Sequence, residues 1–296
     1  MLGHLLSAVG FALPAAAVLL VASVGFTLQF GMTNIFNLGY GAIMTVAALA
    51  GSIVFQNGGG LLASAVTAIV VGVVATVVIG LGLYRPFVRK GAKLFEMIMI
   101  SLAVGLILEY GVGGFMHGNI EHFSLPTPIV VRSGYFILTS LDLGEIAVAI
   151  AVVVGLVAFL KWTPVGIAIR ATAVNAPLAR VTGISTGRIT NLTWIISGGM
   201  CGLAGILLTA EYQSLSSAAA TDYLPIILAA VIVGGVGSIG GTAIASVGLA
   251  ILLQICGALG ASAYETVIAL GVLVVILLLR PKGVFGELWD KKEITV

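Results

Sequence analysis

Charged side chains are scarce along this sequence. Only 8% of its 296 residues are Asp, Glu, Lys or Arg, whereas 60% are hydrophobic, and in a soluble domain about a quarter of the residues are charged. Backbone groups in hydrocarbon are satisfied only inside helices or closed barrels, and barrel strands alternate in polarity over about ten residues. The apolar runs here are continuous. The sequence therefore excludes a soluble fold and predicts an all-α, polytopic bundle of transmembrane helices, with residues 1–296 forming one domain.

Residues that support catalysis or hold a cofactor are also few. Cys201 and Cys256 lie within apolar stretches, which favours packing roles over a disulfide or a redox pair. No Gly-x-x-x-x-Gly-Lys-Ser/Thr sequence occurs, so no P-loop is predicted. An intramembrane enzyme needs a nucleophile with its base, or a metal-ligand cluster, inside the spans, and the sequence offers neither. We expect no enzymatic activity, no cofactor, no metal and, with a net charge of +2, no binding of nucleic acid.

The apolar segments predict the membrane spans. A helix needs about 20 apolar residues to cross the hydrocarbon core, and nine segments approach or exceed that length, which predicts about eight to ten crossings. They lie near 5–30, 35–55, 61–84, 94–116, 143–160, 189–210, 224–238, 240–258 and 263–280.

Basic residues gather in three groups between these spans. The groups are Arg85, Arg89, Lys90 and Lys93; Lys161, Arg170, Arg180 and Arg188; and Arg280, Lys282, Lys291 and Lys292. The loops 117–142 and 211–223 carry acidic residues and, between them, a single basic residue. Because cytoplasmic loops are enriched in Lys and Arg, we predict that the three basic groups face the cytoplasm and that the two acidic loops face outward.

Two stretches rich in glycine and polar residues, near 31–41 and 234–241, interrupt the apolar pattern. Irregular backbone at membrane depth is tolerated where it lines a cavity or is buried in protein, and the ends of broken helices hold solutes in transporters. We therefore predict broken or re-entrant segments here. The alternatives are surface loops and glycine packing contacts, the latter being our interpretation of the glycines in 198–205. The predicted solute pathway consists of Asn34, Asn37, Tyr40, Gly41, Gly234, Gly235, Gly237 and Ser238.

The cytoplasmic loop 161–188 is predicted to contain a short helix. Asn175 can act as its N-cap, Pro177 is tolerated in its first turn and Gly183 can end it at the C′ position. These signals predict a helix over about 176–182. From composition alone, such a helix beside Arg170 and Arg180 suits a position on anionic lipid headgroups.

The same loop resembles the coupling loop of permease subunits of the branched-chain amino acid family of ATP-binding cassette (ABC) importers. The matching residues are Gly166, Arg170, Ala171, Asn175, Ala179, Gly183, Ile184 and Arg188. Four further segments resemble the family in the same order along the chain, namely 37–41, 201–205, 234–238 and 280–286. Each motif is short, but together they span nearly the whole chain.

This resemblance implies a permease subunit of an ABC importer in a bacterial inner membrane. The implied partners are a second permease subunit, identical or related, an extracytoplasmic solute-binding protein and two ATPase subunits. The ATPase subunits would bind the coupling loop through Gly166, Arg170, Asn175, Ala179, Arg180 and Gly183.

The resemblance also bears on the substrate. Where the family commonly has His, Gly and Glu, this chain has Tyr40, Gly41 and Ala42, so the predicted pathway lacks a charged group. The expected substrate is a small solute, either a branched-chain or other amino acid or an amide. The alternative function is a self-sufficient channel or secondary carrier for a small neutral solute such as urea.

Overall fold

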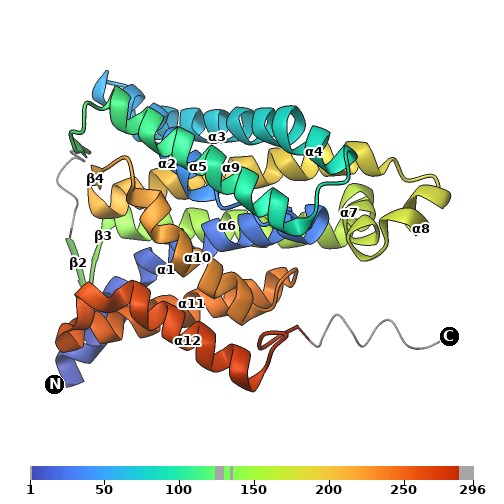
Figure 1. The fold of residues 1–296 in the computed structure, drawn as a ribbon. Helices are drawn as coiled ribbons and strands as arrows, with labels where there is room; N and C mark the ends of the chain where they lie inside the picture. Colours follow the sequence, from blue (N-terminus) through green and yellow to red (C-terminus); the bar gives the residue numbers. More distant parts are fainter. Residues whose placement is uncertain (1, 124–129, 134–135, 287–296) are drawn as a thin grey trace.

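The computed structural model describes residues 2–123, 130–133 and 136–286. These residues form a bundle of long helices (Figure 1), and nine helices occupy the nine predicted spans within the described ranges. They are α1 (Leu2–Thr33), α2 (Tyr40–Gln56), α3 (Leu61–Val77), α5 (Leu94–Phe115), α6 (Ser140–Trp162), α9 (Thr186–Tyr212), α10 (Ala219–Gly234), α11 (Ile239–Cys256) and α12 (Glu265–Leu279).

Six helical segments are long and apolar enough to cross a membrane. One of them, Ile239–Leu279, contains both α11 and α12, which are joined by a π-helical turn η2 (Gly257–Ala261) and a 3-10 turn η3 (Ser262–Tyr264). The remaining two predicted spans, α2 and α10, are shorter, with 17 and 16 residues. The predicted fold class, a polytopic bundle of transmembrane helices, is confirmed.

Several short elements were not predicted from the apolar pattern. Helix α3 continues through a π-helical turn, η1 (Val78–Tyr84), into α4 (Arg85–Arg89), and the loop after α6 contains α7 (Pro164–Val174) before α8 (Ala176–Val181). Strand β1 (Glu121–His122) pairs antiparallel with β4 (Ser214–Leu215), and β2 (Val130–Ser133) pairs antiparallel with β3 (Phe136–Thr139). The strands lie at the end of the bundle where α1 begins (Figure 1).

Glycine brings α3 and α9 close together. A Cβ atom added at Gly72 would lie 2.5 Å from the Gly198 carbonyl oxygen, and one added at Gly198 would lie 2.7 Å from the Gly72 oxygen. Gly202, one turn further along α9, would meet the Ala68 backbone. Because membrane helices gain little from hydrophobic burial against each other, such close contacts stabilise their association. The predicted packing role of the 198–205 glycines agrees with this geometry.

The predicted basic groups gather toward one end of the bundle. Helices α4, α7 and α8 lie at the end opposite the start of α1 and the strands (Figure 1), and the segment after α12 reaches the end of α10, where the Val284 amide donates to the Val233 carbonyl at 2.8 Å. Lys291 and Lys292 lie outside the described residues. This common placement supports a cytoplasmic assignment for that end.

Candidate translocation cavity and coupling surface

The first predicted break separates α1 from α2 at residues 34–39. Asn34 ends α1 with a left-handed φ of 52° and is exposed, and its amide donates to the Phe30 carbonyl at 2.8 Å. Asn37 is fully buried instead, and its Oδ1 accepts from the Tyr84 hydroxyl at 2.8 Å and from the Gly39 amide at 3.2 Å. The break is therefore held in shape by side-chain hydrogen bonds.

The start of α2 lies in the core of the subunit. Tyr40 is fully buried, and its ring meets the Phe26 ring edge to face with centroids 5.4 Å apart. A Cβ atom added at Gly41 would lie 2.5 Å from the Ala220 carbonyl oxygen, so Gly41 allows α2 to approach α10. Asn37, Tyr40 and Gly41 thus pack inside the subunit, whereas Asn34 lies at its surface.

The second predicted break connects α10 to α11. Gly235 and Gly237 have φ values of 96° and 86°, which favour glycine because they belong to the left-handed region. Ser238 then caps α11 by accepting from the Gly241 amide at 3.2 Å. A Cβ atom added at Gly234 would lie 2.5 Å from Thr242 Cα, so Gly234 permits the tight turn between the two helices.

The family-like segment 280–286 packs against this second break. A Cβ atom added at Gly235 would lie 2.8 Å from the Gly286 amide nitrogen, and one added at Gly283 would lie 2.6 Å from the Ile232 carbonyl oxygen. Gly234 and Gly235 therefore serve backbone packing on the inner side of the turn. Gly237 and Ser238 remain on its open side.

The two breaks come together beside a cavity of about 280 Å³. A Cβ atom added at Gly31, in the last turns of α1, would lie 3.5 Å from Gly237 Cα. Two of the eight predicted pathway residues, Gly237 and Ser238, line this cavity, and the other six do not. The lining residues are Thr27, Leu28, Gly31, Met32, Val157, Leu160, Lys161, Ile169, Arg170, Ala173, Gly237, Ser238, Ile239 and Gly240.

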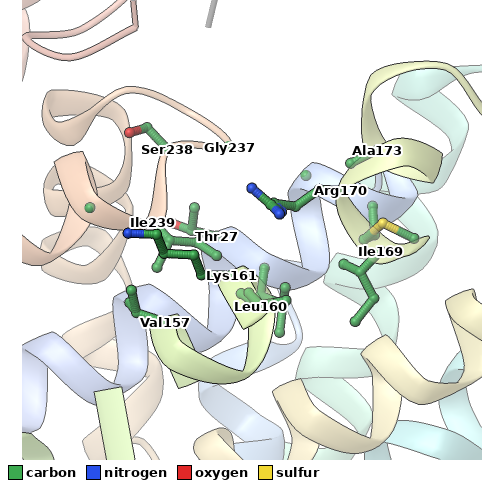
Figure 2. A pocket seen from close by; sticks show the side chains of 14 residues that line it. Thr27, Val157, Leu160, Lys161, Ile169, Arg170, Ala173, Gly237, Ser238 and Ile239 are labelled. Atoms are coloured by element: carbon green, nitrogen blue, oxygen red, sulfur yellow. The ribbon is translucent and has the colours of Figure 1, made fainter. Parts of the chain in front are cut away.

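The charged groups of the cavity come from the end of α6 and the middle of α7. Lys161 and Arg170 line it together with Thr27 and Ser238, and none of the described lining residues is acidic. Figure 2 shows the Arg170 guanidinium pointing across the opening toward the turn that carries Gly237. The cavity thus combines apolar walls with two cations and two hydroxyl groups, which suits a small solute that has both apolar and polar parts.

Hydroxyl groups pair along the interface of α1 and α11 next to the cavity. The Thr27 and Thr242 Oγ1 atoms are 3.0 Å apart, and the Ser23 and Ser246 Oγ atoms are 2.5 Å apart. Single interhelical hydrogen bonds in membranes contribute on average about 0.6 kcal/mol. These pairs therefore fix the register of α1 against α11 without making separation of the two helices costly.

The predicted helix in the loop 161–188 is present as α8, Ala176–Val181. The Asn175 side chain accepts from the Leu178 amide at 3.0 Å, and Gly183 follows the helix with a φ of 86°, as the sequence predicts. A Cβ atom added at Gly166 would lie 2.5 Å from Leu160 Cα, so this glycine lets α7 fold back closely on α6. The capping residues and the tight turn between α6 and α7 together place α8 at the end of the bundle that also holds α4 (Figure 1).

Apolar side chains of α8 are strongly exposed. Val181 is 85% exposed and Leu178 60% exposed, whereas Ala179 is buried. A surface groove beside them is lined by Ile167, Arg170, Ala171, Val174, Asn175, Leu178, Ala179 and Thr182. Arg180 is turned away from this groove, and its Nε donates to Thr186 Oγ1 at 2.9 Å. Gly166 and Gly183 shape the segment from outside the groove.

Sequence reasoning did not assign three polar residues to the cavity or to the core. Lys161 lines the cavity, and Tyr84 is the partner of Asn37. Gln29 is 1% exposed, its Oε1 accepts from the Ser197 hydroxyl at 3.1 Å and its Nε2 has no partner. Gln29 could have been found as a polar residue inside a long apolar run, but its partner on α9 depends on packing that periodicity does not reveal.

These features define a polytopic membrane protein whose helix breaks meet at a solute-sized cavity and which displays, at one end of the bundle, a short helix with exposed apolar side chains. Residues 9–277 match the family model described as "Branched-chain amino acid transport system / permease component". The chain belongs to this family, and the predicted role as a permease subunit of an importer is confirmed.

The relatives of this chain are named for different solutes. It is 28% identical, over 92% of its length, to the probable branched-chain amino acid transport permease protein LivH of Methanocaldococcus jannaschii, and covers 90% of that protein. It is 24% identical to the high-affinity branched-chain amino acid permease LivH of Escherichia coli K12, with 90% of each chain covered. It is also 27% identical to the fructose import permease FruF of Bifidobacterium longum, with 87% of this chain and 72% of that protein covered.

Proposed function

We propose that this permease works in an ABC importer of a bacterial inner membrane. In this proposal two permease subunits, identical or related, stand side by side, two ATPase subunits bind their cytoplasmic ends, and a solute-binding protein delivers the solute outside. ATP hydrolysis belongs to the separate ATPase subunits. The permease needs no cofactor of its own.

The exposed apolar surface of α8 is the observation that carries the ATPase contact. A helix of six residues is too short to be stable alone, yet Asn175 caps it and Gly183 ends it, with Val181 85% exposed. Apolar side chains that project from the cytoplasmic end of a membrane protein suit burial against another protein. The groove beside Leu178 gives such a partner a shaped surface.

Motion of α8 can reach the cavity through α7. Helix α7 contacts α1, α6, α8 and α9, and its buried Ile169 and exposed Arg170 both line the cavity. A push on α8 when the ATPase subunits close would therefore move one wall of the cavity against the Gly237 turn. In this mechanism α8 acts mechanically, and solute passes where the two helix breaks meet.

The cavity supports a small solute with apolar character as substrate. Its apolar lining, two hydroxyl groups and two cations suit an amino acid or an amide. The names of the LivH relatives also support an amino acid as the solute. Another relative, FruF, is named for fructose.

Co-purification with the ATPase subunits tests the proposal. Val181→Glu adds a charge to the most exposed apolar position of α8, and Ser185→Glu adds the same charge to an exposed polar position beyond the end of α8. We expect wild type and Ser185→Glu to retain the ATPase. Retention by Val181→Glu should fall at least about tenfold, because an unpaired carboxylate in a desolvated interface costs more than the ~1.4 kcal/mol that corresponds to that factor.

Two outcomes would contradict the proposal. If Val181→Glu retains the ATPase as wild type does, α8 is not the contact. If wild type binds no ATPase and the reconstituted chain alone passes solute in the absence of ATP, the protein is a self-sufficient channel or carrier.

A further inference from the structure

A second cavity at the cytoplasmic end contains three arginines, and its chemistry differs from that of the first. It measures about 380 Å³ and opens between α4, α8 and the start of α9. Arg85, Arg89 and Arg180 line it, accompanied by hydroxyl and amide groups, and none of its described lining residues is acidic. The polar residues of this arginine cleft, besides the three arginines, are Thr33, Thr172, Thr186, Thr190 and Asn191.

Two of the arginines lie against the first turn of α9. Arg180 Nε donates to Thr186 Oγ1 at 2.9 Å. A Cβ atom added at Gly187 would lie 3.5 Å from Arg85 Nη2. Two guanidinium groups from distant parts of the chain thus converge on the same turn, which favours an anionic ligand between them.

The position of α4 identifies the anion as part of a lipid. Helix α4 ends the membrane-spanning segment Leu61–Arg89, and Phe87 and Val88 are 38% and 49% exposed between the arginines. Exposed apolar side chains next to arginines are typical of the boundary between acyl chains and headgroups. Further along the same segment, Val70, Val74 and Val78 are each more than half exposed, so an apolar stripe leads from the spanning helix toward the cleft.

The arginine cleft is separate from the surface proposed for the ATPase. Arg180 lines the cleft but not the groove beside Leu178 and Val174. Helix α8 therefore has an apolar side without this arginine and a cationic side that faces α4 and α9. An acidic patch of a protein partner is less suited to the cleft than a lipid phosphate, because exposed Val88 lines the cleft and exposed Phe87 precedes it in α4.

We propose that the arginine cleft binds the phosphate headgroup of an anionic phospholipid from the cytoplasmic leaflet, with an acyl chain along the exposed valines of α3 and η1. Because the cleft joins α4, α8 and α9, the bound headgroup holds the coupling helix against the membrane-spanning helices. The binding site itself does not depend on which solute the permease carries.

Lipid retention by the full-length permease tests this inference. The protein is released from phosphatidylcholine nanodiscs that contain phosphatidylglycerol, and native mass spectrometry measures how much phosphatidylglycerol stays bound. The variant Arg85→Gln/Arg89→Gln removes two cleft charges, whereas Lys90→Gln/Arg188→Gln removes two exposed charges outside the cleft. We expect the cleft variant to bind phosphatidylglycerol about thirtyfold more weakly, since each basic residue near an anionic lipid surface contributes about fivefold.

Further measurements decide between the cleft and its alternatives. Arg85→Lys/Arg89→Lys keeps both charges and should stay within about fivefold of wild type, which separates loss of charge from misfolding. Equal retention by the two glutamine variants would overturn the inference. So would an equal rise in unfolding temperature with inorganic phosphate as with phosphatidylglycerol, which would indicate a free-anion site. A cleft variant that keeps the lipid but loses the ATPase would assign the arginines to the ATPase interface instead.

Discussion

At the scale of single residues, the Asn37 side chain accepts hydrogen bonds from two donors at the first helix break that have no other partner among the described residues. Its Oδ1 accepts from the Tyr84 hydroxyl and the Gly39 amide in a fully buried position. Because each buried donor that loses its partner costs about 1–3 kcal/mol, and Asn37→Ala removes the partner of two donors, it should lower the free energy of unfolding by about 2–6 kcal/mol. Equilibrium unfolding in mixed micelles measures this value.

Tyr84→Phe provides the matched comparison. It removes one donor and leaves the bond from the Gly39 amide to Asn37 in place, so the expected loss is about 1 kcal/mol. If Tyr84→Phe destabilises the protein as much as Asn37→Ala, the break is not held by Asn37 in the way its contacts indicate.

The substitution Gly202→Ala tests the close packing of α3 and α9. A Cβ atom added here would collide with the Ala68 backbone, and a backbone neighbour cannot move aside as a flexible side chain can. Overpacking of this kind costs about 1–3 kcal/mol, so Gly202→Ala should lower the unfolding temperature in detergent. Gly248→Ala in α11, where an added Cβ meets no atom within 4 Å, should leave the temperature unchanged or raise it slightly. Equal effects of the two substitutions would contradict the packing argument.

At the scale of elements, helix α8 depends on its cap. Loss of an Asn N-cap costs about 0.5–2 kcal/mol, and a helix of six residues has few other bonds to offset the loss. Asn175→Ala should therefore increase hydrogen exchange of the 176–182 amides about fivefold, which corresponds to ~1 kcal/mol. Asn175→Asp keeps an acceptor for the Leu178 amide and should exchange like wild type. Unchanged exchange in Asn175→Ala would mean that contacts with α7 and α9 alone hold α8.

The same element shows what the sequence can predict. Helix α8 could be predicted from Asn175, Pro177 and Gly183, because helix capping depends on a few neighbouring residues. The observed helix ends within one residue of the predicted range. The short strands and the π-helical turn η1 (Val78–Tyr84) were not predicted. Strand β1 pairs with β4, where Glu121 lies opposite Leu215, and such distant pairing leaves no local pattern when each strand has two residues.

At the scale of the whole molecule, apolar runs predicted the positions of all nine long helices, but not their neighbours. The two helix breaks were predicted from glycine and polar residues, yet their contact at Gly31 and Gly237 depends on how α1 packs against α11. For the same reason only Gly237 and Ser238 of the predicted pathway line the cavity, while Asn37 and Tyr40 became part of the core. Residue type indicates a break in a span, whereas the packing of other helices decides which side of the break stays open.

The packing also indicates where the molecule can move. Glycine contacts join α3 and α9 over several turns, so separating them would open voids along the whole interface. The hydroxyl pairs Thr27–Thr242 and Ser23–Ser246 join α1 and α11, and exchanging such bonds for water near the cavity costs little. We therefore expect α1 and α11 to separate during transport while α3 and α9 move as one body.

A cross-link between α1 and α11 tests this expectation. Thr27→Cys/Thr242→Cys, made with Cys256→Ala to remove a partly exposed thiol, places two thiols where the hydroxyl oxygens are 3.0 Å apart. Oxidation should lower solute uptake by the reconstituted importer at least about tenfold, since a covalent bond removes an opening that the hydrogen bonds permit, and reduction should restore uptake. The two single-cysteine variants should be insensitive to oxidation. Full uptake by a completely cross-linked protein would show instead that α1 and α11 form one rigid unit. The moving boundary would then have to lie on the other side of the cavity, between α1 and the helices α6 and α7, which carry Lys161 and Arg170.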